Sequence, residues 1–482
     1  MKIAEDLREF IQILEDKGEL RRVKAEVDWN LEIGAITRRL MDLKGPAPLF
    51  ENIKDYPGQS LLACPFGPSK PLLGRLALGL DRDIHPLEMV RIAQDRLKLV
   101  KPVMVADAPC RENILKGDDI NVLKFPVPFI HGTDGGRYIG TWCIVITKDK
   151  ARGWTNWSVY RVMVQNEKIV SMNFEMRAQQ HGSQMFERHL ENRKEPYEIA
   201  IVVGADPISL LAATMSPPES ISEVEVAGGL RGAPLKLVKC ETVDLEVPAS
   251  SEVVIEGTIG PDEMWEGPMG EFSGYTGGGK MLLPYVKVSC VMHRNNPVHT
   301  LANMGKPWDD CAVTYPVTYG AWVRKLLQEK GLPVKDVFVL PVYGLVVSVT
   351  GRGGSGVAHN VIKVLRESKA RGYLQYAFIV GDDVDISSLE DVFWCLTTRL
   401  HPKYGIHVVP RPGAIGSPLL PNLMPDEREN HYSYIAYFDC TWPSDWSEEY
   451  LREHTRVIDF ERAWPKEIQD KVLRRWKEYK LD

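Results

Sequence analysis

Two glutamates in a run rich in glycine are the residues of this chain best suited to acid–base chemistry. Glu266 and Glu271 lie five positions apart and enclose the tetrapeptide Gly-Pro-Met-Gly. This spacing puts them on different faces of a helix and on opposite sides of a straight strand. A tight bend, with backbone freedom at Gly267 and Gly270 and a fixed φ at Pro268, would bring both carboxylates to one pocket. Convergent carboxylates divide into one ionised and one protonated group, as general acid–base catalysis requires, and the alternative is an exposed acidic turn.

A second set of residue types could bind a hard divalent cation. Asn156, His181 and Glu223 offer an amide oxygen, an imidazole and a carboxylate from three separate segments. Mn²⁺ and Mg²⁺ prefer oxygen ligands, and Mn²⁺ also accepts an imidazole. The chain has 11 histidines, so spacing alone leaves open whether His181 is a metal ligand or an ordinary solvated or core residue.

A third motif is typical of a nucleotide-binding turn. Residues 351–356 fit Gly-x-Gly-x-x-Gly, follow an apolar strand-like run and precede a helix-like run. The large Arg352 occupies the tight turn, however, and Asp382 lies 26 positions beyond Gly356 (382 minus 356), past the usual interval. A plain turn between strand and helix is therefore the favoured interpretation of this motif. An NAD(P)-dependent oxidoreductase that uses the turn for its cofactor is the alternative hypothesis.

The elements that must position these residues change in type along the chain. Leu7, Phe10, Ile11 and Leu14 recur at helical spacing before Gly18, which predicts a first helix. The middle of the chain is rich in short β-type runs, which predict an antiparallel meander forming a sheet or barrel. These runs are 138–147, 154–164 and 168–174, and further strands are expected at 252–259 and 284–292.

Beyond Pro316 the pattern alternates helix with apolar strand, which predicts an α/β domain with parallel pairing. The expected helices are 321–330, 357–366 and 389–400, and the expected strands are 337–349 and 376–380.

Length and composition restrict the class of protein. A chain of 482 residues exceeds one hydrophobic core and predicts two or three domains. A net charge of -6 without a basic block gives no reason to expect nucleic acid as a partner. The eight cysteines are far apart, which indicates neither a disulfide framework nor a zinc ribbon. The first residues do not resemble a signal peptide and the apolar run 337–349 is too short to span a bilayer, so a cytoplasmic protein without a membrane partner is expected.

Five motifs, in order along the chain, resemble the UbiD family of prenylated-FMN-dependent decarboxylases. They are Asn156-Trp157-Ser158-Val159-Tyr160-Arg161, Gln180-His181, Thr214-Met215-Ser216-Pro217, Ser222-Glu223 and Glu266-Gly267-Pro268-x-Gly270-Glu271. Weaker similarity at 6–10, 45–52, 382–385 and 397–399 extends the resemblance over nearly the whole chain.

The resemblance implies an α/β (α+β) multi-domain fold. Residues 1–115 are expected to form an N-terminal mixed α/β domain, and 116–315 a flavin-reductase-like split β-barrel that binds prenylated FMN. Residues 316–482 are expected to form a C-terminal α/β oligomerisation domain with a helical tail. A homodimer or homohexamer is implied, and a flavin prenyltransferase would supply the cofactor.

The resemblance also implies ligands for the cofactor and two metal ions. Asn156, His181 and Glu223 match positions that bind Mn²⁺ at the cofactor phosphate. K⁺ is expected to bind to the backbone carbonyls of Trp157, Ala213 and Met215. Glu223 would contact both K⁺ and Mn²⁺. The remaining cofactor contacts are expected from Ser158, Val159, Arg161, Gln180, Thr214 and, by a looser alignment, Lys369.

The implied reaction explains why these groups occur together. Losing CO₂ from an sp² carbon leaves an electron pair that no side chain can accept, so a cofactor must act as the sink, in this family through a covalent prenylated-FMN adduct. Arg161, Glu266 and Glu271 match the family's Glu-Arg-Glu network. Glu271 is expected to donate the proton, Arg161 to orient the acids and the substrate carboxylate, and Glu266 to stay ionised.

The expected function is reversible, non-oxidative decarboxylation of an aromatic, heteroaromatic or α,β-unsaturated acid. The segment 438–443 resembles branches that use hydroxybenzoate-type acids and favours an aryl substrate, with pocket residues expected within 308–315, at Tyr343 and within 410–421. Whether the substrate is a free acid, a thioester or a phosphorylated acid stays open. A non-catalytic subunit of a larger carboxylase is a further alternative, although the intact Arg161, Glu266 and Glu271 argue against it.

Overall fold

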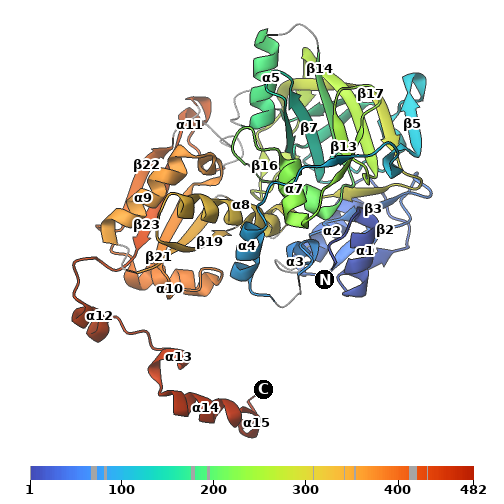
Figure 1. Ribbon diagram of the computed structural model, residues 1–482. Helices are drawn as coiled ribbons and strands as arrows, with labels where there is room; N and C mark the ends of the chain where they lie inside the picture. Colours follow the sequence, from blue (N-terminus) through green and yellow to red (C-terminus); the bar gives the residue numbers. More distant parts are fainter. Residues whose placement is uncertain are drawn as a thin grey trace.

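The computed structural model describes most of the chain. The described residues are 2–66, 73–80, 84–174, 180–192, 196–215, 217–307, 309–340, 342, 344–351, 354–411, 421–430 and 432–481. They form a mixed sheet near the N-terminus, a large curled antiparallel sheet, and an α/β unit that ends in an extended helical tail (Figure 1).

The N-terminal layer is a mixed sheet covered by helices. The sheet has the order β1-β2-β3-β18, with the strands β1 (Leu20–Val23), β2 (Ala47–Phe50), β3 (Ser60–Ala63) and β18 (Val298–Leu301). The helices are α1 (Leu7–Asp16), α2 (Glu32–Asp42), α3 (Leu73–Ala77) and α4 (Pro86–Asp95). The first helix is confirmed, and the side chain of Asp6 caps it by accepting from the backbone N–H of Glu9. Because β18 comes from far along the chain, it attaches this layer to the central sheet.

The central sheet is antiparallel throughout its described pairs, as expected. Its order is β6-β9-β10-β17-β14-β11-β7-β8, with β5 also pairing with β17. The strands are β5 (Asn113–Lys116), β6 (Tyr138–Gly140), β7 (Cys143–Asp149), β8 (Trp154–Ser158), β9 (Val162–Asn166), β10 (Ile169–Met172), β11 (Tyr197–Val203), β14 (Val253–Glu266) and β17 (Met281–His293). The predicted simple meander is wrong, since only β7–β8 and β9–β10 are sequential neighbours, and the run 154–164 divides into two strands.

The central sheet is buried on both faces. Along β11, Ile199 and Ile201 pack into the core inside the curled sheet, whereas Ala200 and Val202 pack into the core shared with the N-terminal layer. Successive side chains of a strand point to opposite faces, so one strand serves two cores. Three helices cover the sheet and its edge, namely α5 (His181–Asn192), α6 (Pro207–Ala213) and α7 (Glu223–Arg231). Smaller pairings involve β4 (Val103–Met104), β12 (Lys236–Lys239), β13 (Glu246–Pro248), β15 (Met269–Gly270) and β16 (Thr276–Gly277).

The C-terminal unit is an α/β sheet of order β19-β20-β21-β23-β22. Its strands are β19 (Val334–Leu340), β20 (Gly344–Val349), β21 (Tyr376–Gly381), β22 (Ile406–Arg411) and β23 (Ser433–Cys440). Its helices are α8 (Asp310–Glu329), α9 (Gly354–Glu367), α10 (Leu389–Arg399) and α11 (Pro425–Asn430). Parallel pairing is confirmed for β20–β21 and β21–β23.

Two expected elements of this unit need correction. The strand expected over 337–349 is an antiparallel hairpin of β19 and β20, in which Leu340 at the end of β19 pairs with Gly344 at the start of β20. The helix expected from 321 begins at Asp310, because Asp309 caps it through a bond from the N–H of Ala312 and its first turns are buried. Pro316 therefore lies inside α8 rather than before it.

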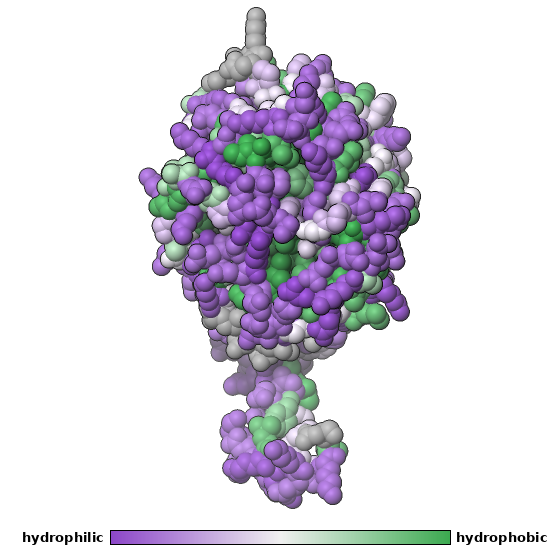
Figure 2. Space-filling view, turned by 90° about the vertical axis from the view of Figure 1, so that its right-hand side faces the viewer, coloured by the Kyte–Doolittle hydropathy of each residue, from purple (hydrophilic) through white to green (hydrophobic). Residues whose placement is uncertain are grey.

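The chain ends in a helical tail that projects from the body (Figures 1 and 2). The tail helices are α12 (Glu448–His454), α13 (Phe460–Ala463), α14 (Lys466–Arg474) and α15 (Trp476–Tyr479). Large hydrophobic side chains stay exposed along the tail, among them Ile458, Leu473 and Leu481. None of the helices in the described ranges combines the length and the apolar composition needed to cross a membrane. All eight cysteines are free thiols.

Candidate active site

The two glutamates of the predicted bend contact one arginine. Arg161, in the loop between β8 and β9, donates from Nε to Oε1 of Glu266 at 2.9 Å and from Nη2 to Oε2 at 2.6 Å. Its Nη1 donates to Oε1 of Glu271. Glu266 is fully buried, and only 4% of Glu271 is exposed. The structure therefore brings together the three residues expected in the network and excludes an exposed acidic turn.

Glycine is required at the bend because the backbone passes close to this network. Gly267 has a φ of +79°, a conformation that side chains with a β-carbon rarely adopt. A β-carbon at Gly267 would lie 2.8 Å from the carbonyl oxygen of Gly279 and 3.2 Å from Nη2 of Arg161. The chain leaves β14 at Glu266 and returns through β15, where Gly270 pairs with Thr276 of β16. The bend thus directs both carboxylates to the same guanidinium.

The charges of this network favour a proton on Glu271. Burial raises the pKa of Glu271 above its ordinary value, and Arg161 only partly opposes this effect. Burial lowers the pKa of Arg161, but the nearby carboxylates of Glu271 and Glu266 outweigh burial and raise it. One buried cation neutralises one carboxylate, so a proton on the second carboxyl leaves the group without a net charge. Glu266 has the bidentate ion pair, whereas Glu271 accepts from a single nitrogen of Arg161.

Tyr138 is a member of the network that sequence analysis missed. Its hydroxyl donates to Oε1 of Glu266 at 3.0 Å, and its side chain is 1% exposed. Burial raises the pKa of the Tyr138 hydroxyl, which therefore stays protonated and acts as a donor. Tyr138 begins β6, more than a hundred positions before Glu266, and no short motif joins the two.

The three residues expected to bind Mn²⁺ surround strand β8. Asn156 lies on β8, and Glu223 begins α7, where its Oε2 accepts from the N–H of Trp157 at 2.8 Å. His181 begins α5, and its ring lies edge-on to that of Trp154 with centroids 4.6 Å apart. The start of α7 is tied to β8, because Ser222 Oγ donates to the carbonyl oxygen of Thr155 at 2.7 Å.

The donor atoms of these residues fit a bound cation. Oδ1 of Asn156 and Nε2 of His181 are buried and have no hydrogen-bond partner among the described residues. Glu223 is 1% exposed, and burial raises its pKa to about 8, despite backbone N–H donors from Trp157 and from Glu223 itself. Unpartnered buried acceptors and a desolvated carboxyl are costly unless an ion or water satisfies them. Within the described ranges, no three His, Cys, Asp or Glu side chains cluster as metal ligands. The set of Asn156, His181 and Glu223 contains only two such residues, and its third donor is the amide of Asn156.

The residues expected at a K⁺ site lie in adjoining elements. Trp157 is on β8, Ala213 ends α6, and Met215 follows it; all three are buried. Helices α6 and α7 contact each other and both contact β8. Thr214 between them bonds through its hydroxyl to Leu211 O at 2.8 Å and to the Thr318 hydroxyl of α8 at 3.3 Å.

The other expected cofactor contacts are less closely grouped. Ser158 Oγ accepts from Nδ2 of Asn156 at 3.0 Å, and Gln180 is exposed just before α5. Val159 packs against the core shared with the N-terminal layer. Lys369 lies in the C-terminal unit, where burial first and Arg371 second lower its pKa to about 7. No described contact joins Lys369 to the Asn156 set.

The glycine-rich turn follows β20 and leads into α9, as expected, but residues 352 and 353 lie outside the described residues. Of the two acids beyond it, only Asp383 has a described partner for its carboxylate. Asp383 forms a bidentate pair with Arg399, with distances of 2.8 and 2.7 Å. The carbonyl oxygen of Asp382 accepts from Lys335.

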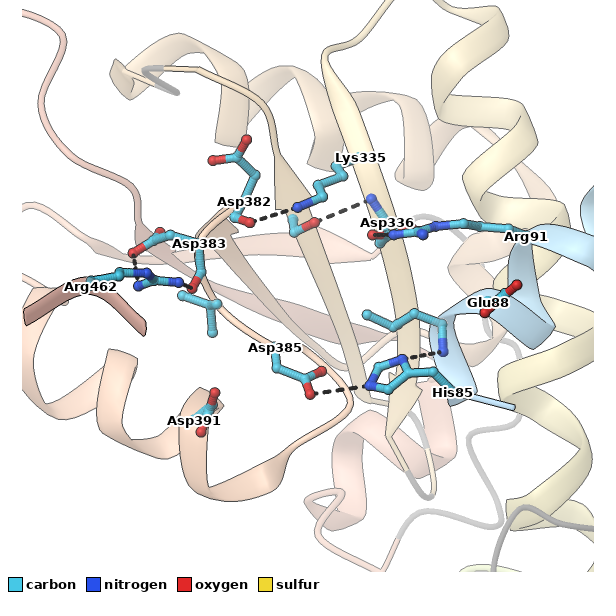
Figure 3. Close-up of a pocket in the computed structure, with 13 residues that line it drawn as sticks. His85, Glu88, Arg91, Lys335, Asp336, Asp382, Asp383, Asp385, Asp391 and Arg462 are labelled. Atoms are coloured by element: carbon cyan, nitrogen blue, oxygen red, sulfur yellow. Dashed lines mark hydrogen bonds and ion pairs between the residues drawn. The ribbon is translucent and has the colours of Figure 1, made fainter. Parts of the chain in front are cut away.

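A charged cavity of about 370 Å³ lies between α4 and the C-terminal sheet (Figure 3). It contains none of the residues expected in catalysis or metal binding. Most of its charges are paired, for example Arg91 with Asp336 at 2.5 Å and His85 with Asp385 at 3.4 Å. We interpret it as part of the polar interface between α4 and the C-terminal unit rather than as the candidate site.

Comparison with known proteins gives consistent matches over most of the chain. Family models described as domains of 3-octaprenyl-4-hydroxybenzoate carboxy-lyase match residues 11–96 (N-terminal), 101–307 (Rift-related) and 316–435 (C-terminal). Pyrrole-2-carboxylic acid decarboxylase of Pseudomonas aeruginosa is 31% identical, with 99% of this chain and 98% of that protein covered. Ferulic acid decarboxylase 1 of Saccharomyces cerevisiae is 30% identical, with the same coverage of 99% and 98%.

Solved structures share the whole fold. Vanillic acid decarboxylase of Sedimentibacter hydroxybenzoicus in its closed form has a TM-score of 0.86 at 29% identity, and the alignment covers 100% of both chains. The UbiD-class enzyme HmfF from Pelotomaculum thermopropionicum, in complex with prFMN, has a TM-score of 0.76 at 28% identity, covering 92% of this chain and 96% of that one. The expected α/β multi-domain fold is therefore confirmed, and the central sheet, expected as a split β-barrel, is a curled half-barrel.

Proposed function

This chain belongs to the UbiD family, and we propose that it catalyses reversible, non-oxidative decarboxylation of an aromatic, heteroaromatic or α,β-unsaturated acid. The observation that carries the proposal is the buried set of Glu266, Arg161 and Glu271, in which one guanidinium is shared by two carboxyl groups. Such a set can hold a proton on one acid beside a fixed positive charge.

Each residue of the set has a separate role in the proposed reaction. Arg161 would orient the substrate carboxylate through charge-assisted hydrogen bonds, and the ion pair with Glu266 would fix its plane. Glu271 would hold the proton at Oε1 or Oε2 and deliver it to the carbon that loses CO₂. Tyr138 would keep Glu266 in place through its hydroxyl hydrogen bond. Burial of the whole set excludes water that would otherwise protonate the carbon without control.

We propose prenylated FMN, Mn²⁺ and K⁺ as the bound cofactors. Asn156, His181 and Glu223 would bind Mn²⁺ at the cofactor phosphate; the unpartnered buried atoms of the first two and the desolvated carboxyl of the third support this assignment. Carbonyls of Trp157, Ala213 and Met215 would hold K⁺. When bound, prenylated FMN would supply the electron sink that the side chains cannot.

An aryl acid is the proposed substrate class. Relatives named for pyrrole-2-carboxylic and vanillic acids, which carry the carboxyl on the ring, support this choice, whereas ferulic acid carries it on an alkene and represents the α,β-unsaturated alternative. Phe272 follows Glu271 directly, and its ring lies edge-on to that of Tyr315 on α8, with centroids 6.1 Å apart. An aromatic pair next to Glu271 in this way supports an aryl substrate. Trp308, Tyr343 and 412–420, other expected pocket residues, lie outside the described residues.

Loading the protein with cofactor tests this function. Protein from a host that cannot prenylate flavin should release no CO₂ from a panel of aryl acids, because its own side chains offer no electron sink. Co-production with a flavin prenyltransferase, followed by oxidation, should give activity on at least one acid and a ligand whose mass is that of prenylated FMN. Protein loaded with plain FMN is the control. Released NAD(P), or full activity without prenylated flavin, would contradict the proposal.

We also propose a homodimer or homohexamer that forms through the C-terminal unit. On the edge strand β22, Ile406 and Val408 are 46% and 63% exposed, and Tyr434 on the neighbouring β23 is 46% exposed. An unprotected apolar edge of this kind favours association.

Val408→Asp should therefore reduce the molar mass measured by light scattering to that of a smaller assembly or a monomer, because the new charge would be buried at the contact. Met104→Asp, on the exposed strand β4, is the matched control. An unchanged mass for Val408→Asp would exclude β22 from the interface.

A further inference from the structure

A charged pair of side chains lies directly behind the bend that carries Glu271. The carboxylate of Asp134 is buried and accepts from the backbone N–H of Gly270 at 2.9 Å, one residue before Glu271. It also accepts from the N–H of His131 at 3.0 Å, and both of its oxygens lie 3.1 Å from Nδ1 of His131.

A second contact joins the same loop to the bend, because the N–H of Gly135 donates to the carbonyl oxygen of Pro268 at 2.7 Å. The loop 131–135 thus holds the bend at two points.

The hydrogen-bond partners of His131 define its charge. Its Nε2 lies 2.9 Å from Oδ1 of Asn303. The orientation of that amide is fixed, because Nδ2 of Asn303 donates to the carbonyl oxygen of Gly34 at 2.6 Å. Both ring nitrogens therefore face acceptors, which requires a proton on each. Burial lowers the pKa of His131, but the hydrogen bond and charge of Asp134 outweigh burial and raise it above its ordinary value.

The imidazolium also packs closely on the bend. A β-carbon at Gly270 would lie 2.6 Å from Nδ1 and 2.7 Å from Cε1 of His131. Only glycine lets the chain approach the ring this closely. The position of Gly270, and with it the start of the Glu271 side chain, is therefore set by contact with His131 as well as by the bond to Asp134.

We propose that the His131–Asp134 pair is a positioning device for the proton donor, in which Asp134 holds Gly270 and keeps Glu271 facing Arg161. The inference rests on the proposed function, since it assigns the pair to the step that uses Glu271. Neither residue would contact the substrate.

The charge of Asp134 gives the pair a second, measurable effect. Burial is the main cause of the raised pKa of Glu271, Arg161 opposes it, and Glu266 and Asp134 add to it. The Cys311 thiol of α8 also faces Glu271, and burial raises the pKa of that thiol well above its ordinary value, so it stays neutral. Among the charges around Glu271, Asp134 makes no described hydrogen bond to Arg161, so replacing it deletes no partner of that guanidinium.

Asp134→Asn tests the inference, because it keeps the size of the side chain and removes its charge. We expect kcat to fall about tenfold to hundredfold with little change in KM, since misplaced donors slow the chemical step more than binding. We also expect the alkaline limb of the kcat–pH profile to move to lower pH, because Glu271 would lose its proton earlier. Asp385→Asn, in the unrelated His85–Asp385 pair, is the matched control and should change neither quantity.

A readout without turnover separates this inference from the proposed function. The infrared band of the protonated Glu271 carboxyl, identified as the band that E271Q lacks, should titrate at lower pH in Asp134→Asn than in wild type. If wild type decarboxylates no acid but the band shifts, the proposed function fails and the inference on the pair holds.

His131→Gln is a second variant should Asp134→Asn fold poorly, since it keeps the hydrogen bond that the N–H of Gly270 donates to Asp134. It should show a smaller loss of kcat at unchanged cofactor content and unfolding temperature. Wild-type kcat, pH profile and band titration in Asp134→Asn would overturn the inference, as would wild-type values in His131→Gln where Asp134→Asn does not fold.

Discussion

Replacing Glu271 with glutamine should lower decarboxylation by about 10²–10⁴-fold, the usual contribution of a positioned general acid. Glutamine keeps the size of the side chain and can still accept a hydrogen bond from Arg161, but it cannot deliver a proton. Incorporation of solvent deuterium into the product should fall with the rate. Steady-state kinetics and mass spectrometry of the product measure the two effects.

The prediction also fixes the direction in which the decarboxylation rate changes with pH. Burial raises the pKa of Glu271, so the wild-type rate should be highest while the carboxyl is protonated and should decline as pH rises through that pKa. E271Q should lack this decline. For the same reason the folded state holds this proton to higher pH than the unfolded state does, so the contribution of Glu271 to the free energy of unfolding falls as pH rises. At pH 8, E271Q should therefore unfold at a temperature no lower than that of wild type.

Glu266→Gln is the comparison variant. It should also slow turnover, by weakening the bidentate pair with Arg161, yet it should retain the decline of rate with pH. Near-wild-type turnover and deuterium incorporation in E271Q would show that another group donates the proton.

Local signals in the sequence predicted the bend at the centre of the site, although they left an exposed acidic turn as the alternative. The bend between Glu266 and Glu271 follows from glycine, proline and an odd spacing, all visible in one short segment. The antiparallel centre and the parallel pairs of the C-terminal unit followed from the types of residues in each run. The convergence of Arg161 on the bend followed only from the family resemblance, because the residues are more than a hundred positions apart.

The supporting residues were missed because their roles depend on long-range contacts. His131 meets Asn303 across 172 positions, and Asn303 in turn meets Gly34 across 269 positions. A buried tyrosine such as Tyr138 looks like any core aromatic until its hydroxyl partner is known.

The errors in secondary structure have a different origin. The reversal between Leu340 and Gly344 lies inside one apolar run, and the capping aspartate of α8 precedes a proline that suggests a break. In the hairpin, Pro341 and Gly344 are local turn signals that the apolar run obscured, whereas in α8 the burial of the first turns outweighed the proline.

Removing one of the expected metal ligands should have the other large effect. Glu223→Gln should abolish Mn²⁺ binding and reduce retention of prenylated FMN, because the ion would neutralise the phosphate beside a desolvated carboxyl. His181→Ala should do the same through loss of Nε2. Elemental analysis and the absorbance of bound flavin measure both quantities, and Glu225→Gln in the same first turn of α7 is the matched control.

Stability provides a second readout for Glu223, with opposite signs in the presence and absence of metal. Burial raises the pKa of Glu223 to about 8 in the metal-free protein. Its folded state therefore binds a proton that the unfolded state releases above its own pKa near 4.5, and stability declines as pH rises from there to about 8. In EDTA at pH 8, E223Q should accordingly unfold at a temperature no lower than wild type.

Mn²⁺ should raise the unfolding temperature of wild type and leave that of E223Q unchanged, since a ligand stabilises only the state that binds it. Full Mn²⁺ occupancy in both E223Q and His181→Ala, or equal stabilisation of wild type and E223Q by Mn²⁺, would exclude these residues as the metal site.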